Sequence, residues 1–213
     1  MKTRSKALLL TLCAVLLVAA TIFGTMAYLT STDTVTNTFT VGKVNIKLDE
    51  AKANPDGSLA ENADRVKANE YKLLPGHTYN KDPMVTVLNG SESSYVKMTV
   101  TFSKANELDA IFAPDGANLT RIFNGYDASN WIAKGNTKDA TANTRTYEFW
   151  YKEAVAAPDG DVALDALFDS ITVPGTITGE QLETIKGMTI TVNAYAIQAD
   201  GFADADAAWA AFH

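Results

Sequence analysis

The residues that could perform chemistry in this chain are few and scattered. There are two histidines, His77 and His213, and one cysteine, Cys13. A catalytic zinc site normally takes about three protein ligands, and a Ser-His-Asp site needs an imidazole beside its nucleophile. His77 follows Pro75 and Gly76 in a predicted turn, and His213 has no neighbouring histidine. We therefore predict no catalytic residue, no metal site and no cofactor.

Carboxylates are plentiful, and acidic loops can hold calcium. Two groups of aspartates lie close together in the sequence: Asp159, Asp161 and Asp165, and Asp200, Asp204 and Asp206. Neither group has the spacing of a known calcium loop. The pattern indicates turns, helix caps and solubility instead.

Aromatic rings offer a third kind of chemistry, because tryptophans can stack on sugars. Trp131, Trp150 and Trp209 are the candidates, although at this density tryptophans more often serve the core. The chain contains no glycine-rich phosphate loop and no dinucleotide fingerprint.

The first 27 residues predict a secretory signal peptide. Three cations precede an uncharged apolar run, and the small Ala27 is followed by Tyr28, which together favour cleavage between these two residues. The alternative is a retained membrane anchor, because the 23 residues from Ala7 to Leu29 carry no charge and are long enough to span a bilayer. The sequence leaves both possibilities open.

Charge and cysteine content narrow the function classes. The chain has 213 residues, 46% of them hydrophobic, and a net charge of −7. Without residues 1–27 it has 15 cations, 25 anions and no cysteine, and its net charge is −10. Such an acidic body repels phosphate backbones, so we predict no nucleic-acid binding and no membrane contact except through an uncleaved signal. Export without disulfides suggests a bacterial surface.

Alternating hydrophobicity predicts an all-β fold. Three long rows alternate apolar and polar residues, over 95–102, 146–152 and 188–196, and a shorter row follows Pro83. Helical patterns are short, at 106–112, 179–185 and 204–212. Pro-Asp-Gly triplets mark turns. We predict one jelly-roll-like antiparallel β-sandwich over residues 43–213, with two or three short helices in its connections.

Residues 28–42 predict a separate arm ahead of the sandwich. Phe39 and Val41 share one parity, whereas Val44, Ile46 and Leu48 share the opposite one. The slip falls at Gly42, which indicates either a bend within the first strand or a hinge. The arm is rich in threonine and lacks proline, and segments of this kind pair with sheet edges. We name five arm residues as assembly candidates: Tyr28, Leu29, Val35, Phe39 and Val41.

The segment that runs from Gly24 to Ile46 resembles the start of the TasA/camelysin family of secreted Gram-positive proteins. The family pattern has a Gly-Thr cleavage region, an Ala-aromatic junction, a threonine-rich arm and a final Phe-x-x-Gly-x-Val-x-Ile block. A second resembling block comprises Leu74–Gly76, Asp82–Val87, Asn89–Ser91 and Tyr95–Val96. The resemblance covers roughly the first half of the chain, and the second half agrees only loosely.

The resemblance implies a jelly-roll sandwich that forms extracellular fibres of a biofilm matrix or cell surface. One subunit would donate its N-terminal strand to the next, head to tail, after cleavage by a signal peptidase of the SipW type. Matrix accessory proteins are further partners that it implies. Camelysin relatives are also classed as metallo-endopeptidases, but this chain shows no zinc motif, so we predict no enzyme.

Three functions therefore stand as hypotheses. The first is an exported structural subunit that polymerises through its arm. The second is a camelysin-like surface metallo-endopeptidase, and the third is a monomeric adhesion or binding module that uses exposed tryptophans. The first predicts fibres that depend on residues 28–41, the second bound zinc, and the third a species that stays monomeric when concentrated.

Overall fold

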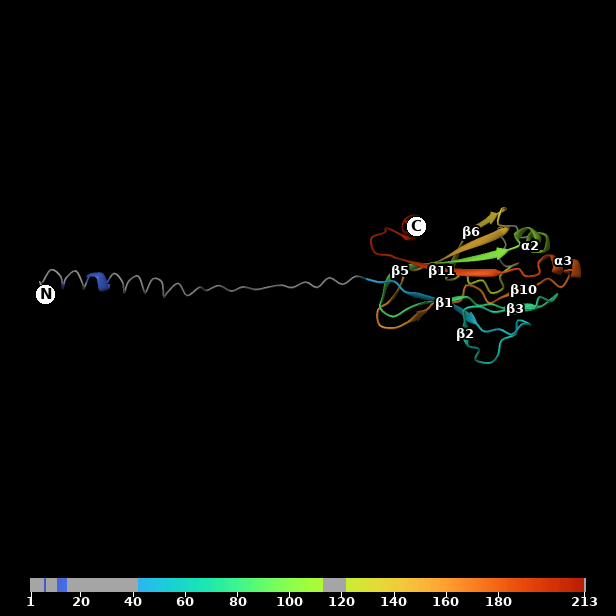
Figure 1. Ribbon diagram of the computed structural model, residues 1–213, viewed down its shortest axis with the longest axis horizontal. Helices are drawn as coiled ribbons and strands as arrows, with labels where there is room; N and C mark the ends of the chain where they lie inside the picture. The colour runs from blue at the N-terminus through green and yellow to red at the C-terminus, as the bar shows by residue number, and fades with distance from the viewer. Residues whose placement is uncertain (1–5, 7–10, 15–41, 113–121, 213) are drawn as a thin grey trace. The chain divides into compact units, whose positions relative to one another are not determined.

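The structure is a computed structural model that describes residues 6, 11–14, 42–112 and 122–212 (Figure 1). The chain divides into two units, residues 1–40 and residues 41–213. In the first unit the described residues are helical and exposed. Among the described residues, no helix is long and apolar enough to cross a membrane. The predicted signal peptide and cleavage site lie outside the described residues.

The second unit is an antiparallel β-sandwich, as the sequence predicted (Figure 1). One sheet has the order β2-β1-β4-β9, formed by Arg65–Val66, Ile46–Ala51, Met84–Val87 and Val162–Ala163. The larger sheet has the order β11-β5-β7-β6, formed by Ile190–Gln198, Ser91–Ser103, Thr144–Tyr151 and Trp131–Asp139. β8 (Val155–Ala157) pairs with β5, and β10 (Ser170–Thr172) pairs with β3 (Thr78–Asn80).

The inner faces of the central strands form the core. The apolar rows predicted from alternation point inward: Val85 and Val87 on β4, Val96, Met98 and Val100 on β5, and Phe149 on β7 are all fully buried. Phe123 packs among Phe102, Tyr147, Phe149 and Phe168, with ring centroids 4.6–5.8 Å apart. These contacts stabilise the core, because burial of large apolar side chains is the main stabilising term in folding.

Short helices occupy the connections, close to the ranges where helical patterns predicted them. α2 spans Ala105–Phe112, α3 spans Gly179–Thr184 and α4 spans Ala205–Ala210. Thr178 and Gln181 form a capping box on α3, and Asp204 caps α4 through Ala207 N–H at 2.9 Å. The predicted fold class, an all-β sandwich with a few short helices, is confirmed.

β6 is a strand that alternation did not reveal. Only Trp131 is buried, and the remaining residues are exposed or half-buried. The strand lies at the edge of the larger sheet, carries Lys134 and Lys138, and contains a bulge between Ala133 and Gly135. Charged residues and bulges are the devices that protect an edge strand from pairing with other chains.

Candidate functional site

The sandwich has a second exposed edge, where β1 and β11 lie beside each other without pairing. Cα atoms of these two strands come within 8 Å of one another. β2 covers β1 only at Glu50 and Ala51, and no described strand pairs with the outer edge of β11. The region between them, which we call the β1–β11 groove, is therefore lined by backbone groups that lack a strand partner.

The register of β1 shows which backbone groups point into this groove. Leu88 donates its N–H to the carbonyl of Asn45 at 2.9 Å, so the odd-numbered residues of β1 bond to β4. Ile46 and Leu48 then direct their N–H and C=O groups away from β4. The Lys67 ammonium donates to the carbonyl of Leu48. A side chain thus occupies one acceptor that a further strand would use.

The same reasoning applies to β11, which bonds only to β5. Ser103 donates its N–H to the carbonyl of Thr189 at 3.0 Å, which places the odd-numbered residues of β11 against β5. Ile190, Val192 and Ala194 therefore present their N–H and C=O groups to the groove. Their side chains pack against the core yet remain partly exposed.

The groove has walls of mixed chemistry. Its volume is about 360 Å³, and it is lined by Leu48, Asp49, Glu50, Lys67, Ala68, Asn69, Lys81, Ile190, Thr191 and Val192. Three of these residues, Asn69, Lys81 and Ile190, also line a larger cavity of about 830 Å³. The larger cavity is mostly apolar and continues toward α2 and α3, with Phe102, Leu108, Leu182 and Met188 in its lining.

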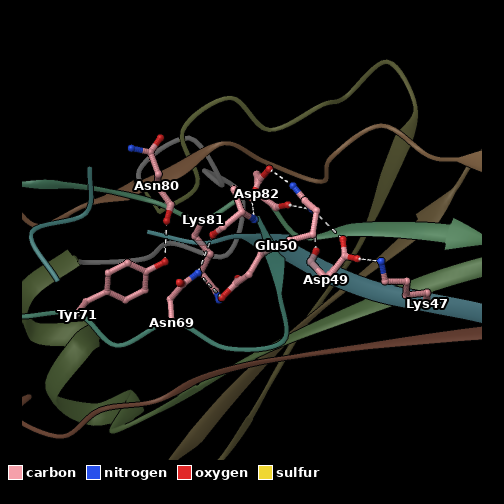
Figure 2. Close-up of polar contacts among 10 residues, drawn as sticks. Lys47, Asp49, Glu50, Asn69, Tyr71, Asn80, Lys81 and Asp82 are labelled. Carbon is pink, nitrogen blue, oxygen red and sulfur yellow. Dashed lines mark hydrogen bonds and ion pairs between the residues drawn. The ribbon is translucent and has the colours of Figure 1, made fainter. Parts of the chain in front are cut away.

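A cluster of charged residues forms the polar wall at the end of β1 (Figure 2). The carboxylate of Asp49 accepts from Arg65 Nε at 2.9 Å and pairs with Lys47 Nζ at 2.6 Å. Arg65 also bonds to the carboxylate of Asp82, and Asp82 Oδ1 accepts from the N–H of Ala51 at 2.6 Å. Because Arg65 is on β2 and Asp82 precedes β4, the cluster ties three segments together.

Next to it lies a buried ion pair between Glu50 and Lys81. Lys81 Nζ is 2.5 Å from Glu50 Oε2, and each side chain is only 8% exposed. Asn69 Nδ2 donates to Glu50 Oε1 at 3.0 Å and to the carbonyl of Ala51 at 2.8 Å. Tyr71 donates its hydroxyl to the carbonyl of Asn80 at 2.6 Å, and burial raises its pKa. These contacts satisfy the buried charges, which would otherwise be costly.

Hydrogen bonds keep Asp49 charged. Burial by itself raises the pKa of this carboxyl, but the hydrogen bonds and positive charges of Lys47 and Arg65 outweigh it, so the pKa lies below its ordinary value. A carboxyl whose pKa is lower in the folded than in the unfolded chain stabilises the fold above its unfolded pKa. That stabilisation disappears as the pH falls through the folded pKa.

Asp49→Asn is therefore expected to lower the free energy of unfolding by about 1–3 kcal/mol at pH 7. The gap between wild type and variant is expected to shrink below about pH 4, because the wild-type carboxyl then becomes neutral too. Urea unfolding from pH 7 to pH 2.5 measures both. Asp64→Asn serves as the control, since the exposed Asp64 side chain makes no ion pair among the described residues. A gap that stays constant with pH contradicts this account.

The histidine and the aspartates that were considered for catalysis or metal binding lie in turns, in loops or at the start of a helix. His77 is exposed in its turn and lies near Tyr79, with ring centroids 6.3 Å apart. Asp161 accepts from the N–H of Asn89 at 2.8 Å, and Asp204 caps α4. Within the described ranges, no three His, Cys, Asp or Glu residues come together as a metal site. His213 lies outside those ranges.

The tryptophans have mostly structural positions. Trp131 and Trp209 are buried, and Trp150 is half-buried with Lys134 Nζ 3.8 Å from its ring centroid. The ring centroid of Trp209 lies 6.0 Å from the ring centroid of Trp150 and 4.5 Å from Lys97 Nζ. A lysine thus lies over one face of Trp150 and one face of Trp209, where a sugar could otherwise stack.

Of the predicted assembly residues, the structure describes the hinge alone. Tyr28, Leu29, Val35, Phe39 and Val41 lie outside the described residues, as does Ala27. Gly42 is exposed, and a Cβ atom there would lie 2.8 Å from Glu92 Cγ. Directly after it, Lys43 O accepts from the N–H of Glu92 at 2.9 Å, so the chain is fixed to the sandwich from this residue onward.

The sequence did not point to the groove or its charged wall. One signal was available: Glu50 shares the parity of Ile46 and Leu48, which face the core. A charge on the apolar face of a strand indicates a buried partner, and that partner is Lys81.

Comparison of the chain with protein-family models, curated proteins and solved structures gives no match.

Proposed function

We propose that the protein is an exported structural subunit that polymerises by strand donation. Residues 28–41 of one subunit would lie along the β1–β11 groove of the next and form an extracellular fibre. The observation that carries this proposal is the unprotected edge of β11. Addition of a strand to such an edge supplies backbone hydrogen bonds for affinity, while alternate side chains provide specificity.

The two edge strands of the larger sheet differ in how well they are protected against pairing with another chain. β6 carries two lysines and a bulge, which protect it. β11 extends for nine residues, Ile-Thr-Val-Asn-Ala-Tyr-Ala-Ile-Gln, with no charge, no proline and an unbroken register against β5. An unprotected edge of this length invites pairing with another chain, so assembly is directed to β11 rather than to β6.

The arm has the pattern that this edge requires. Leu29, Val35, Phe39 and Val41 are odd-numbered, whereas its threonines are all even-numbered. As a strand, the arm would present one hydroxyl-rich face and one mainly apolar face, on which Ser31, Asp33 and Asn37 also lie. The apolar face suits the partly exposed side chains of Ile46, Leu48 and Val192, which border the groove.

The position of the arm in the sequence favours exchange between subunits. The arm ends at Gly42, next to the first fixed residue of the sandwich, and a neighbouring subunit offers the same groove. A contact between two different surfaces of identical subunits does not close on itself, so it propagates as a filament. Export through the predicted signal, with cleavage between Ala27 and Tyr28, would deliver the subunit to the cell surface or matrix.

Val192→Pro tests the role of the β11 edge. The N–H of Val192 faces the groove, so proline removes a donor that only an added strand would use, and proline is tolerated at such edge positions. We expect fibre growth to fall at least about tenfold, because one ladder bond is lost and the pyrrolidine ring obstructs the incoming strand. Negative-stain microscopy and light scattering measure growth, and circular dichroism checks the fold.

Val192→Ala is the matched control. It removes more of the side chain than proline does but keeps the N–H group, so it is expected to assemble at close to the wild-type rate. Normal fibres from a folded Val192→Pro protein would show that assembly does not use this edge.

A further inference from the structure

Lys67 has an unusual place at the rim of the β1–β11 groove. Its side chain is exposed, lines the groove and donates to the carbonyl of Leu48, one of the β1 acceptors that face outward. Among the described residues it forms no ion pair, in contrast to Lys47, Arg65 and Lys81. Lys67 therefore covers an edge carbonyl, while no described residue supplies a counterion for its charge.

The neighbouring cations are already neutralised. Lys81 is paired with Glu50, Arg65 with Asp49 and Asp82, and Lys47 with Asp49. A strand that entered the groove would displace Lys67 from Leu48 and remove water from its ammonium. Burying a charge without a partner is unfavourable by several kcal/mol in the general case, so the incoming strand must bring an anion.

The arm carries one charged side chain, and it is an anion. Asp33 is the sole charge in residues 28–41, and it shares the odd parity of Leu29, Val35 and Phe39. It would therefore lie on the apolar face of the strand, toward the groove, where a carboxylate also needs a partner. Of the two described cations that line the groove, only Lys67 has no ion pair among the described residues, and Asp33 is the one charged residue of the arm.

We infer that Asp33 of the donated arm pairs with Lys67 of the receiving subunit and fixes the register of strand insertion. This inference rests on the proposed function. A backbone N–H of the arm takes over the carbonyl of Leu48, and the released ammonium bonds to the carboxylate. The carbonyl, the ammonium and the carboxylate would thus each have a partner after insertion.

The ion pair specifies what parity alone does not. A slip of one residue turns the threonine face toward the core and is rejected by the apolar pattern. A slip of two residues keeps the apolar face inward, so hydrophobic contact discriminates against it only weakly. It moves Asp33 by about 7 Å along the strand, however, which separates it from Lys67. The charge pair therefore selects one register among those that parity allows.

Charge reversal tests this pairing in chains that begin at Tyr28. Asp33→Lys and Lys67→Asp each place like charges together, and each is expected to raise the critical concentration for fibre formation at least about tenfold. The double variant Asp33→Lys/Lys67→Asp restores the opposite charges and is expected to return to within about threefold of wild type. Sedimentation of fibres at low salt measures the critical concentration, and circular dichroism confirms that each monomer is folded.

Lys52→Asp provides the matched control, because it makes the same charge change at an exposed lysine that does not line the groove. It is expected to assemble like wild type. The pairing is refuted if the double variant is as impaired as the single variants, or if Lys67→Asp assembles like Lys52→Asp. A chain lacking residues 28–42 distinguishes failure of strand donation from failure of the Asp33–Lys67 pairing. If this chain still forms fibres, or if the wild-type chain forms none, strand donation is wrong and the pairing is wrong with it.

Discussion

A chain that begins at Lys43 is expected to remain monomeric at concentrations where a chain that begins at Tyr28 forms fibres. The shorter chain keeps the whole sandwich but has no strand to donate. Its groove stays available, yet nothing in the solution fills it. This is the largest functional effect we expect, because in the proposed fibre every contact between successive subunits depends on the arm.

The truncation should leave the fold intact. The sandwich is fixed from Lys43 onward, through the bond from Glu92 N–H to Lys43 O and through the 3.0 Å bond from Asn45 N–H to Ser91 Oγ. Negative-stain microscopy and analytical centrifugation measure assembly, while thermal unfolding compares the stability of the two monomers. Undiminished fibres from the shorter chain would contradict strand donation.

Two controls separate loss of the donated strand from loss of chain length. The first keeps all residues but replaces Val35, Phe39 and Val41 with Thr, which retains β propensity and removes the apolar face. It is expected to assemble as poorly as the truncated chain. The second adds a synthetic peptide of residues 28–41 to the intact chain, and the peptide is expected to inhibit elongation by occupying grooves.

Local patterns allowed the central part of the fold to be predicted. The alternation over 95–102 marks β5 because both of its neighbours, β11 and β7, leave one face of it against the core. The helix caps at Thr178 and Asp204 are equally local. β6 escaped prediction because an edge strand buries little, and here Trp131 alone is buried. Its strand character comes from pairing with β7, which local residue preferences do not reveal.

Only one of the two parts of the candidate site, the arm, could be predicted from the sequence. The composition of residues 28–41 predicts a strand that seeks an edge, because β propensity and low charge are properties of the segment itself. The groove is a property of topology: β1 and β11 are far apart in the chain, and they become neighbours only because β11, the edge strand of the larger sheet, lies beside the part of β1 that β2 leaves uncovered. Whether a strand edge lacks a partner depends on how all the other strands pair, so the local sequence of one segment does not predict it.

Lys81→Met is expected to produce the largest loss of stability. It removes one partner of a buried ion pair and leaves the carboxylate of Glu50 with the hydrogen bond from Asn69 but no cation in contact. Breaking such a pair typically costs about 3–5 kcal/mol. For a domain of this size the melting temperature should fall by roughly 10 °C. Urea unfolding of the monomeric protein measures the free energy directly.

The double variant Glu50→Leu/Lys81→Met distinguishes a buried charge from lost packing. An apolar pair of similar volume often replaces a buried ion pair at little cost, so the double variant should lie within about 2 kcal/mol of wild type. Lys47→Met is the control for an exposed partner, because the Lys47 side chain is 50% exposed and its pair with Asp49 should contribute less than about 1 kcal/mol. A double variant as unstable as Lys81→Met would show that the methylenes of Lys81, rather than its charge, stabilise this wall of the groove.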